Sequence, residues 1–129
     1  MIWRLCSIVA LVFAIGCGTP TTHNAGPMEI ELDVFSGRPN PRWLASPEHA
    51  ASVSAALSSL PAAPDQPEPG HLGYRGFVVR QQGLSARVYG GRVIVTANGT
   101  TRTFVDSTGL EKQLTDDASA RGFGDIVKQ

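Results

Sequence analysis

Residues 28–35 constrain the fold more than any other segment, because they alternate strictly between apolar and acidic side chains up to position 34. A period of two places the apolar side chains on one face of an extended chain and the acids on the other. The segment therefore predicts a strand with one buried face. The acids that share its exposed face are Glu29, Glu31 and Asp33.

Arginines dominate the stretch from residue 69 to 105, which holds five of them and no acidic residue. We expect them to pair across strands with the three acids, because opposite charges on neighbouring strands stabilise a sheet. The alternative is a basic surface attracted to anionic lipid head groups, at about 1 kcal/mol per residue near the surface. The five are Arg75, Arg80, Arg87, Arg92 and Arg102.

A loop and a helix follow the first predicted strand. Two prolines and a glycine in residues 36–43 predict irregular structure. The helix starts after Ser46, which can cap it, with Pro47 suited to its first position. Pro61 ends the helix, and residues 61–70, with four prolines, predict a stiff, exposed loop.

Residues 71–105 predict β-structure, because β-branched and aromatic residues are interrupted there by turn residues. Asn98-Gly99 is typical of a tight hairpin turn. Gly90-Gly91 fits either a turn or a bulge within one long strand.

A second helix is predicted near the C-terminus. Asp106, Ser107 or Thr108 can cap its start, and Gly122 is a suitable residue at its end. Residues 123–129 add a short turn that packs apolar side chains.

The order of these elements predicts the fold class. It is strand, helix, three or four strands and helix, or β-α-β-β-β-α in outline. Adjacent strands with tight turns imply an antiparallel sheet, and helices on one face give an α+β fold. We therefore expect a small two-layer sandwich in which two helices cover an antiparallel sheet of four to five strands. The total length of 129 residues fits one domain, at residues 28–129.

Residues 1–17 predict an export signal. Arg4 supplies a positive charge, residues 5–15 are almost wholly apolar, and a polar stretch follows Cys17. As a helix the apolar run would span about 16 Å, roughly half of a bilayer core, which is too short for a comfortable transmembrane anchor. The alternatives are a plain secretory signal or a membrane-spanning N-terminus.

The sequence Ala14-Ile15-Gly16-Cys17 resembles the lipobox of bacterial lipoproteins. The resemblance implies that a diacylglyceryl group is attached to the Cys17 thiol and that cleavage removes residues 1–16. Residues 17–27 would then be the lipidated cysteine and a flexible tether. Gly18, in place of an aspartate, favours the outer membrane if the envelope is Gram-negative, on its periplasmic face or at the surface.

Lipidation would also leave the domain without a disulfide. The chain has two cysteines. Cys6 would leave with the signal, and the thiol of Cys17 would carry the lipid. The domain would therefore be stabilised by packing, whereas many small exported domains use disulfides.

The loop at residues 35–43 is the first candidate binding site. Arg38, Asn40 and Trp43 supply a guanidinium, an amide and an indole, which suit a carboxylate, a phosphate or a sugar. The prolines restrict the loop, and rigid loops on a scaffold often carry function. The structural alternative is that Arg38 pairs with Asp33 or caps a helix end, and that Trp43 fills the core beneath the helix.

Tyr74 and Arg75 form a second candidate, because the glycines on either side of them can let a ligand approach the backbone. The alternative is a strand that enters the sheet with a glycine bend. The two segments together resemble small exported bacterial domains of unassigned function, which share a Phe-Ser-Gly-Arg-Pro-Asn-Pro-x-Trp stretch, here residues 35–43. This resemblance implies no activity.

Other function classes find little support in the sequence. Eleven basic and eleven acidic residues balance, so charge gives no reason to expect nucleic acid as a partner. The three histidines lack metal-ligand spacing, so we expect neither a metal nor a cofactor. Ser36 lacks the strand-to-helix elbow of a hydrolase nucleophile.

Three hypotheses of function remain. The first is a membrane-anchored binding or envelope-structural module whose protein, glycan or small-anion partner meets the five candidate residues. The second is a small cell-envelope hydrolase, which needs Ser36 or an acid beside His49 or His71. The third is an inhibitor that plugs a partner enzyme with residues 36–43. The sequence favours a binding module over an enzyme.

Overall fold

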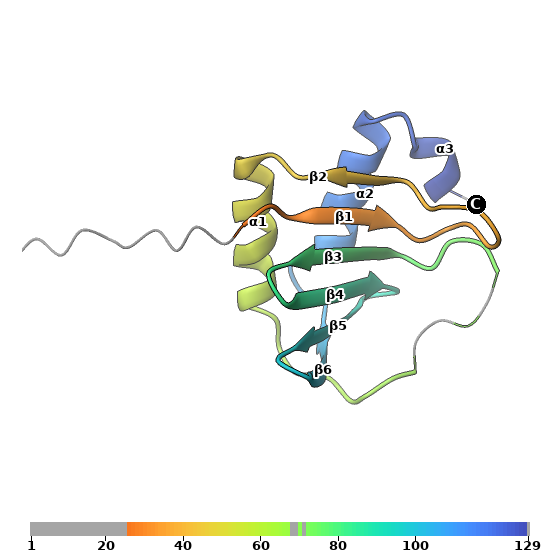
Figure 1. Ribbon diagram of the computed structural model, residues 1–129. Coiled ribbons are helices and arrows are strands. Elements are labelled where there is room, and N and C mark those ends of the chain that lie inside the picture. The colour runs from red at the N-terminus through yellow and green to blue at the C-terminus, as the bar shows by residue number, and fades with distance from the viewer. Residues whose placement is uncertain (1–25, 68–69, 71, 129) are drawn as a thin grey trace, which may run out of the picture.

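The computed structural model describes residues 26–67, 70 and 72–128. Those residues form one six-stranded antiparallel sheet and three helices (Figure 1). The strands are β1 (Glu29–Leu32), β2 (Arg42–Leu44), β3 (Phe77–Gln81), β4 (Leu84–Tyr89), β5 (Arg92–Ala97) and β6 (Thr100–Val105). The helices are α1 (Pro47–Ser58), α2 (Leu110–Ala120) and α3 (Gly124–Val127).

The sheet has the order β2-β1-β3-β4-β5-β6, and every neighbouring pair is antiparallel. Two-residue turns join the last four strands, at Gln82-Gly83, Gly90-Gly91 and Asn98-Gly99, and all six turn residues have positive φ. Hairpin turns of type I′ need positive φ at both positions. The predicted turn at Asn98-Gly99 is therefore confirmed, and Gly90-Gly91 is a turn rather than a bulge.

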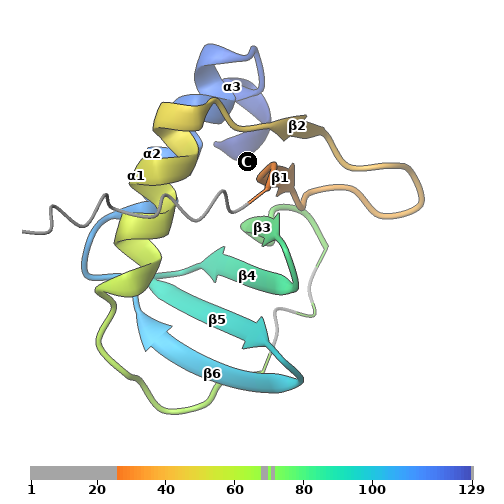
Figure 2. The same ribbon diagram turned by 60° about the vertical axis from the view of Figure 1, so that its left-hand side comes forward.

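Helices cover one face of the sheet and leave the other face open (Figures 1 and 2). The apolar side chains of residues 28–34 point to the covered face and are buried there. They meet Val53 of α1 and the buried side chains Leu110, Leu114 and Ala118 of α2. The alternating pattern therefore predicted correctly which face of β1 packs on the helices. The expected exposure of the acids is wrong for Glu31 and Asp33, which are buried on the other face.

Residues that the sequence predicts as caps bond the first turns of α1 and α2. Ser46 accepts a hydrogen bond from the backbone N–H of His49 at 3.2 Å, and Pro47 is the first residue of α1. The carboxylate of Asp106 accepts hydrogen bonds from the backbone N–H groups of Leu110 and Glu111, at 2.7 and 2.9 Å. Of the three predicted caps for α2, Asp106 is the one that bonds the free end of the helix.

The α+β class and the antiparallel sheet are confirmed, but the predicted strand count and order are wrong. The described residues contain six strands rather than four or five, and three helices rather than two. The extra strand β2 lies partly within the loop that was expected to be irregular. It forms because β1 needs a partner on its outer edge: Pro41 accepts a hydrogen bond from Leu32, and Ala45 donates one to Met28.

The extra helix α3 takes the place of the predicted C-terminal turn. Phe123, Ile126 and Val127 are half-buried and pack against the core, as the pattern of apolar residues indicated. Among the described residues, no helix combines the length and the apolar character needed to cross a membrane. The predicted signal, Cys17 and most of the predicted tether lie outside the described residues.

Candidate functional site

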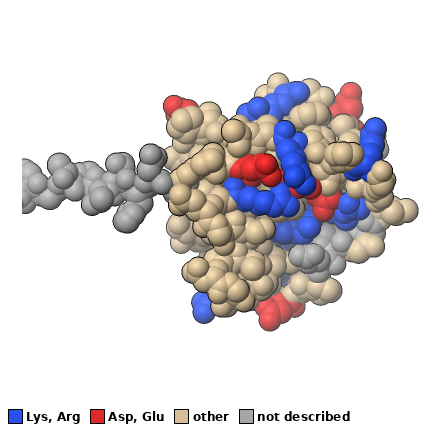
Figure 3. Space-filling view, in the orientation of Figure 1, with Lys and Arg blue, Asp and Glu red and all other residues tan. Residues whose placement is uncertain are grey.

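A network of charged residues occupies the open face of the sheet. Two acids of β1, and a third directly after it, lie among arginines of the neighbouring strands and of the segment before β3. Figure 3 shows acidic atoms between basic ones at the centre of this face. We call this set the charged network. Its members are Glu29, Glu31, Asp33, Arg42, Arg75, Arg80 and Arg87.

Asp33 is the most connected acid of the network. Its carboxylate lies 2.6 Å from Nη2 of Arg75 and 2.7 Å from Nη1 of Arg87, and its side chain is 10% exposed. Burial alone would raise the pKa of Asp33, but the hydrogen bonds and charges of the two arginines outweigh burial and lower the pKa. Asp33 therefore keeps its charge to a lower pH than an isolated aspartate does.

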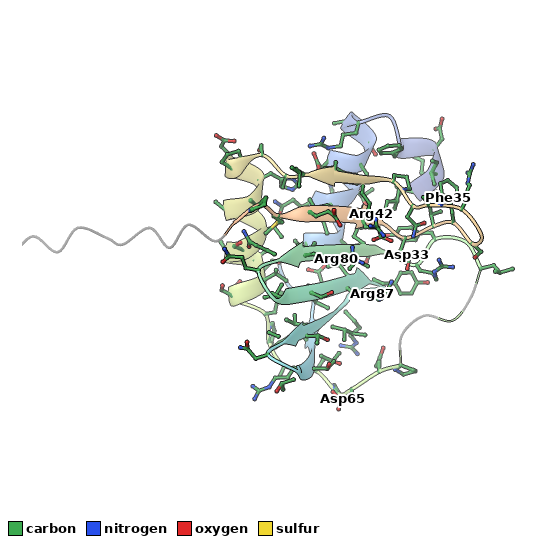
Figure 4. All side chains as sticks on the ribbon, in the orientation of Figure 1. Asp33, Phe35, Arg42, Asp65, Arg80 and Arg87 are labelled. Atoms are coloured by element: carbon green, nitrogen blue, oxygen red, sulfur yellow. The ribbon has the colours of Figure 1, made fainter. Side chains whose placement is uncertain are left out.

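Glu31 has a similar environment. Nη1 of Arg80 lies 2.7 Å and Nε of Arg42 lies 3.1 Å from its carboxylate, and the Glu31 side chain is 8% exposed. Burial opposes ionisation here too, but bonds from Asn40 and Arg80 and the charges of both arginines lower the pKa of Glu31. Figure 4 shows Arg42 on β2, on one side of β1, and Arg80 and Arg87 on β3 and β4, on its other side, with Asp33 at the end of β1.

Asn40 joins this network to the loop between β1 and β2. Its Oδ1 accepts hydrogen bonds from the backbone N–H groups of Val34 and Phe35, at 3.1 and 2.8 Å. Its Nδ2 donates to Glu31 at 2.9 Å and to Asp33 at 3.1 Å. One amide therefore holds both sides of the loop base together and fastens the base to the sheet.

Arg75 fastens the loop from the other side. Its guanidinium, besides bonding Asp33, donates to the carbonyl of Phe35 at 3.1 Å and to Oγ of Ser36 at 3.3 Å. The backbone N–H of Arg75 also donates to the carbonyl of Asp33 at 2.7 Å. The loop base is thus held by two polar side chains that lie far apart in the sequence.

The tip of the loop, residues 36–39, is exposed at all four positions. Figure 2 shows the β1–β2 loop projecting from the body of the domain. The guanidinium of Arg38 lies over the ring of Phe35, 3.5 Å from its centroid, which is cation–π geometry. Arg38 therefore presents its charge to solvent in a defined position.

Trp43 lies on the helix side of β2, away from the loop tip. Its indole Nε1 donates to Asp117 of α2 at 2.7 Å, and its ring stacks on Phe123 with centroids 5.8 Å apart. The guanidinium of Arg121 lies 5.3 Å from the Trp43 ring. Trp43 thus attaches β2 to α2 and α3, in line with the structural alternative stated from the sequence.

Tyr74 is also engaged within the domain. Its hydroxyl donates to Glu111 at 2.8 Å, and its ring packs near those of Phe77 and Tyr89. Burial, and next the bond to Glu111, raise the pKa of Tyr74. Gly76, two residues after Tyr74, packs against β4 and does not face open space. A Cβ there would stand 2.0 Å from the carbonyl oxygen of Val88.

The structure thus brings together three of the five predicted site residues. Arg38, Asn40 and Arg75 meet at the β1–β2 loop, whereas Trp43 and Tyr74 bond to α2. The expected cross-strand pairing of the acids is confirmed for Arg75, Arg80 and Arg87. Among the described residues, no ion pair involves Arg92 or Arg102. The sequence did not predict that Arg42 pairs with Glu31 and so belongs to the network.

Of the arrangements considered for hydrolysis, the described residues contain an acid beside His49. Nδ1 of His49 lies 3.4 Å from Asp117, on the same oxygen that accepts from Trp43. Ser36 instead accepts from Arg75. His23 and His71 lie outside the described residues. Within the described part of the chain, no three side chains of His, Cys, Asp or Glu gather as a metal site would require.

Comparison with known proteins adds no relative. The chain matches no protein-family model, no curated protein and no solved structure.

Proposed function

We propose that this protein is a lipid-anchored, exported binding module that presents residues 36–39 to a partner in the bacterial cell envelope. The anchor is Cys17, whose lipobox-like context supports it. The observation that carries the proposal is the loop base. Asn40 and Arg75 use their polar groups to hold the loop in one conformation, while Arg38 at the exposed tip has its guanidinium on Phe35.

Pre-organisation is the physical reason to expect binding by such a loop. A flexible loop loses conformational entropy when a partner orders it, at about 0.5–1.5 kcal/mol for each immobilised side chain. The bonds of Asn40 and Arg75 to residues 33–36 meet part of that cost during folding. A projecting loop with a fixed cation then gains affinity from few contacts.

The chemistry of the tip selects an anionic group on the partner. Arg38 offers a planar guanidinium that suits a carboxylate or a phosphate. The charged network beneath the loop contributes four arginines against three acids, so its fixed charge is also positive. A protein, a glycan or a small anion with such a group is the expected partner, and inhibition of a partner enzyme is one form that this binding can take.

The proposal is tested by recovering the partner with matched variants. The full chain, tagged at its C-terminus, is produced with its signal in a bacterial envelope, cross-linked in intact cells, extracted in detergent and purified. Arg38→Ala removes the tip charge, and Asn40→Ala loosens the loop base. Arg102→Ala is the control, because Arg102 is an exposed arginine on β6, at the far edge of the sheet.

The expected result is one partner that is recovered with the wild type and with Arg102→Ala. Its recovery falls by about tenfold with Arg38→Ala, which corresponds to roughly 1.4 kcal/mol for a charge-assisted contact. Asn40→Ala reduces recovery as well, although it leaves Arg38 in place. Equal recovery of the partner with all four proteins contradicts the assignment of binding to the loop.

A further inference from the structure

A shallow groove of about 560 Å³ lies at the opposite end of β1 from the loop, where the chain enters the described domain. Its walls come from the residues before β1, the end of β2 and the start of α1. No ionisable side chain is among the described residues that line it. Four of the lining residues are Gly26, Leu44, Pro47 and Ala51.

Leu44 makes this groove unusual. It is 62% exposed, and it and Leu72 are the two large hydrophobic residues that stand out as exposed in the described part of the chain. Leu44 pairs with Glu29 at the start of β1, whereas Leu72 lies near Gly76, which bonds Asp33 beyond the end of β1. The two exposed leucines therefore lie at opposite ends of the sheet.

We infer that this groove faces the membrane that holds Cys17, with Leu44 and Ala51 in contact with lipid at the boundary between head groups and acyl chains. The inference rests on the proposed lipid anchor. Its support is the place where the chain enters: Gly26 lines the groove, and its carbonyl accepts a hydrogen bond from Gln81 at 2.9 Å. The entry point is therefore fixed to the domain beside Leu44.

Because the anchor is close to the groove, a weak contact with lipid is enough to orient the domain. Ten residues separate Cys17 from Met28, and a coil of that length spans roughly 17–19 Å. The groove is thus held close to the bilayer, at the high effective concentration that a short linker gives. A few apolar side chains that would not bind a membrane alone can then orient the domain.

The charges around the groove define the kind of lipid surface that it fits. Glu48 follows Pro47 in α1, and Glu29, the residue paired with Leu44 across the strands, lies 3.5 Å from Arg80, so charges of both signs lie beside the groove. Attraction and repulsion by anionic head groups oppose each other here. The contact is therefore apolar in origin, and it depends little on the anionic lipid content of the bilayer.

This orientation places the loop away from the bilayer. Residues 36–39 follow the far end of β1, and Figure 1 shows the chain entering at one end of that strand and the β1–β2 loop at the other. A membrane-facing groove would therefore leave the Arg38 tip directed at partners in the adjoining compartment.

Depth measurements on the lipidated protein test the inference. Mature protein extracted from membranes is placed in vesicles of phosphatidylethanolamine and phosphatidylglycerol. The lipid on Cys17 leaves an introduced cysteine as the sole reactive thiol. A fluorophore is attached in turn to the Leu44→Cys, Ala51→Cys and Leu72→Cys variants, and quenching by lipids with doxyl groups is measured. Leu72→Cys is the matched control for an exposed leucine.

The expected result is quenching at positions 44 and 51 that exceeds quenching at position 72 by about threefold or more, with little change as the phosphatidylglycerol fraction varies. Adding Leu44→Ser to the Ala51→Cys protein reduces quenching there. Equal quenching at all three positions in protein that floats with the vesicles overturns the inference and leaves the anchor intact. Protein that does not float with vesicles contradicts the anchor and the inference together.

Discussion

The two ends of β1 are built from opposite chemistry. At the loop end, Asp33 and the amide of Asn40 join a network in which carboxylates and guanidinium groups satisfy one another. At the entry end, Gly26, Leu44 and Ala51 line a mainly apolar groove, in which Ser54 and Gln81 are the polar side chains among the described lining residues and none is ionisable. Directional bonds fix one loop conformation, whereas apolar contacts are non-directional and suit a fluid surface. The comparison teaches that the two ends of one strand differ in chemistry in the way that our proposal requires, with recognition at the loop end and anchoring at the entry end.

The largest expected effect comes from removing the acid at the loop end. Asp33→Ala leaves Arg75, Arg87 and Asn40 without their shared acceptor, so we expect a loss of about 2–3 kcal/mol in the free energy of unfolding. Urea denaturation measures it. The control is Asp116→Ala, whose partner Lys112 and own side chain are both exposed, and which should cost less than about 0.5 kcal/mol. Equal losses would show that the network contributes no more than a surface ion pair.

Acid should also weaken the loop end selectively. The pKa values of Glu31 and Asp33 are lowered in the folded state from ordinary values of 4.5 and 3.8. As pH falls below those values, the unfolded chain binds protons that the folded chain does not, so the free energy of unfolding decreases. Thermal unfolding between pH 7 and pH 3 measures the decrease. The Asp33→Asn protein should show a smaller decrease, and an identical pH profile would contradict the role of Asp33.

The smallest effect on stability is expected at the entry end. Leu44→Ser replaces an exposed side chain, so it should change the free energy of unfolding by less than about 0.5 kcal/mol. Denaturation of the wild-type and variant proteins in detergent measures the difference. A loss as large as that of Asp33→Ala would show that Leu44 stabilises the fold, and the contrast between the two ends would then fail.

The sequence predicted the parts of the fold that depend on local pattern. The alternation at residues 28–34 identified β1 and its buried face, and Ser46 and Pro47 identified the start of α1. It did not predict β2, because three residues beside a proline carry no strand signal of their own. They become a strand because the outer edge of β1 needs hydrogen-bond partners.

The candidate site was also predicted only in part, because some of its contacts form only in the tertiary fold. Opposite charges on neighbouring strands indicated that Arg80 and Arg87 pair with the acids of residues 29–33. The role of Asn40 depends on the reversal of the loop, which brings its amide back to Glu31 and Asp33 across seven to nine residues. No pattern in the sequence encodes that reversal before the tertiary fold exists.

Intact mass of the protein extracted from membranes tests the anchor, on which the assignment of the two ends depends. Mass spectrometry of the detergent-extracted full-length product should give a chain that begins at Cys17 and carries the added mass of a diacylglyceryl group, with or without a further acyl chain. A chain that retains residues 1–16, or one that begins at an unmodified Cys17, would contradict the account.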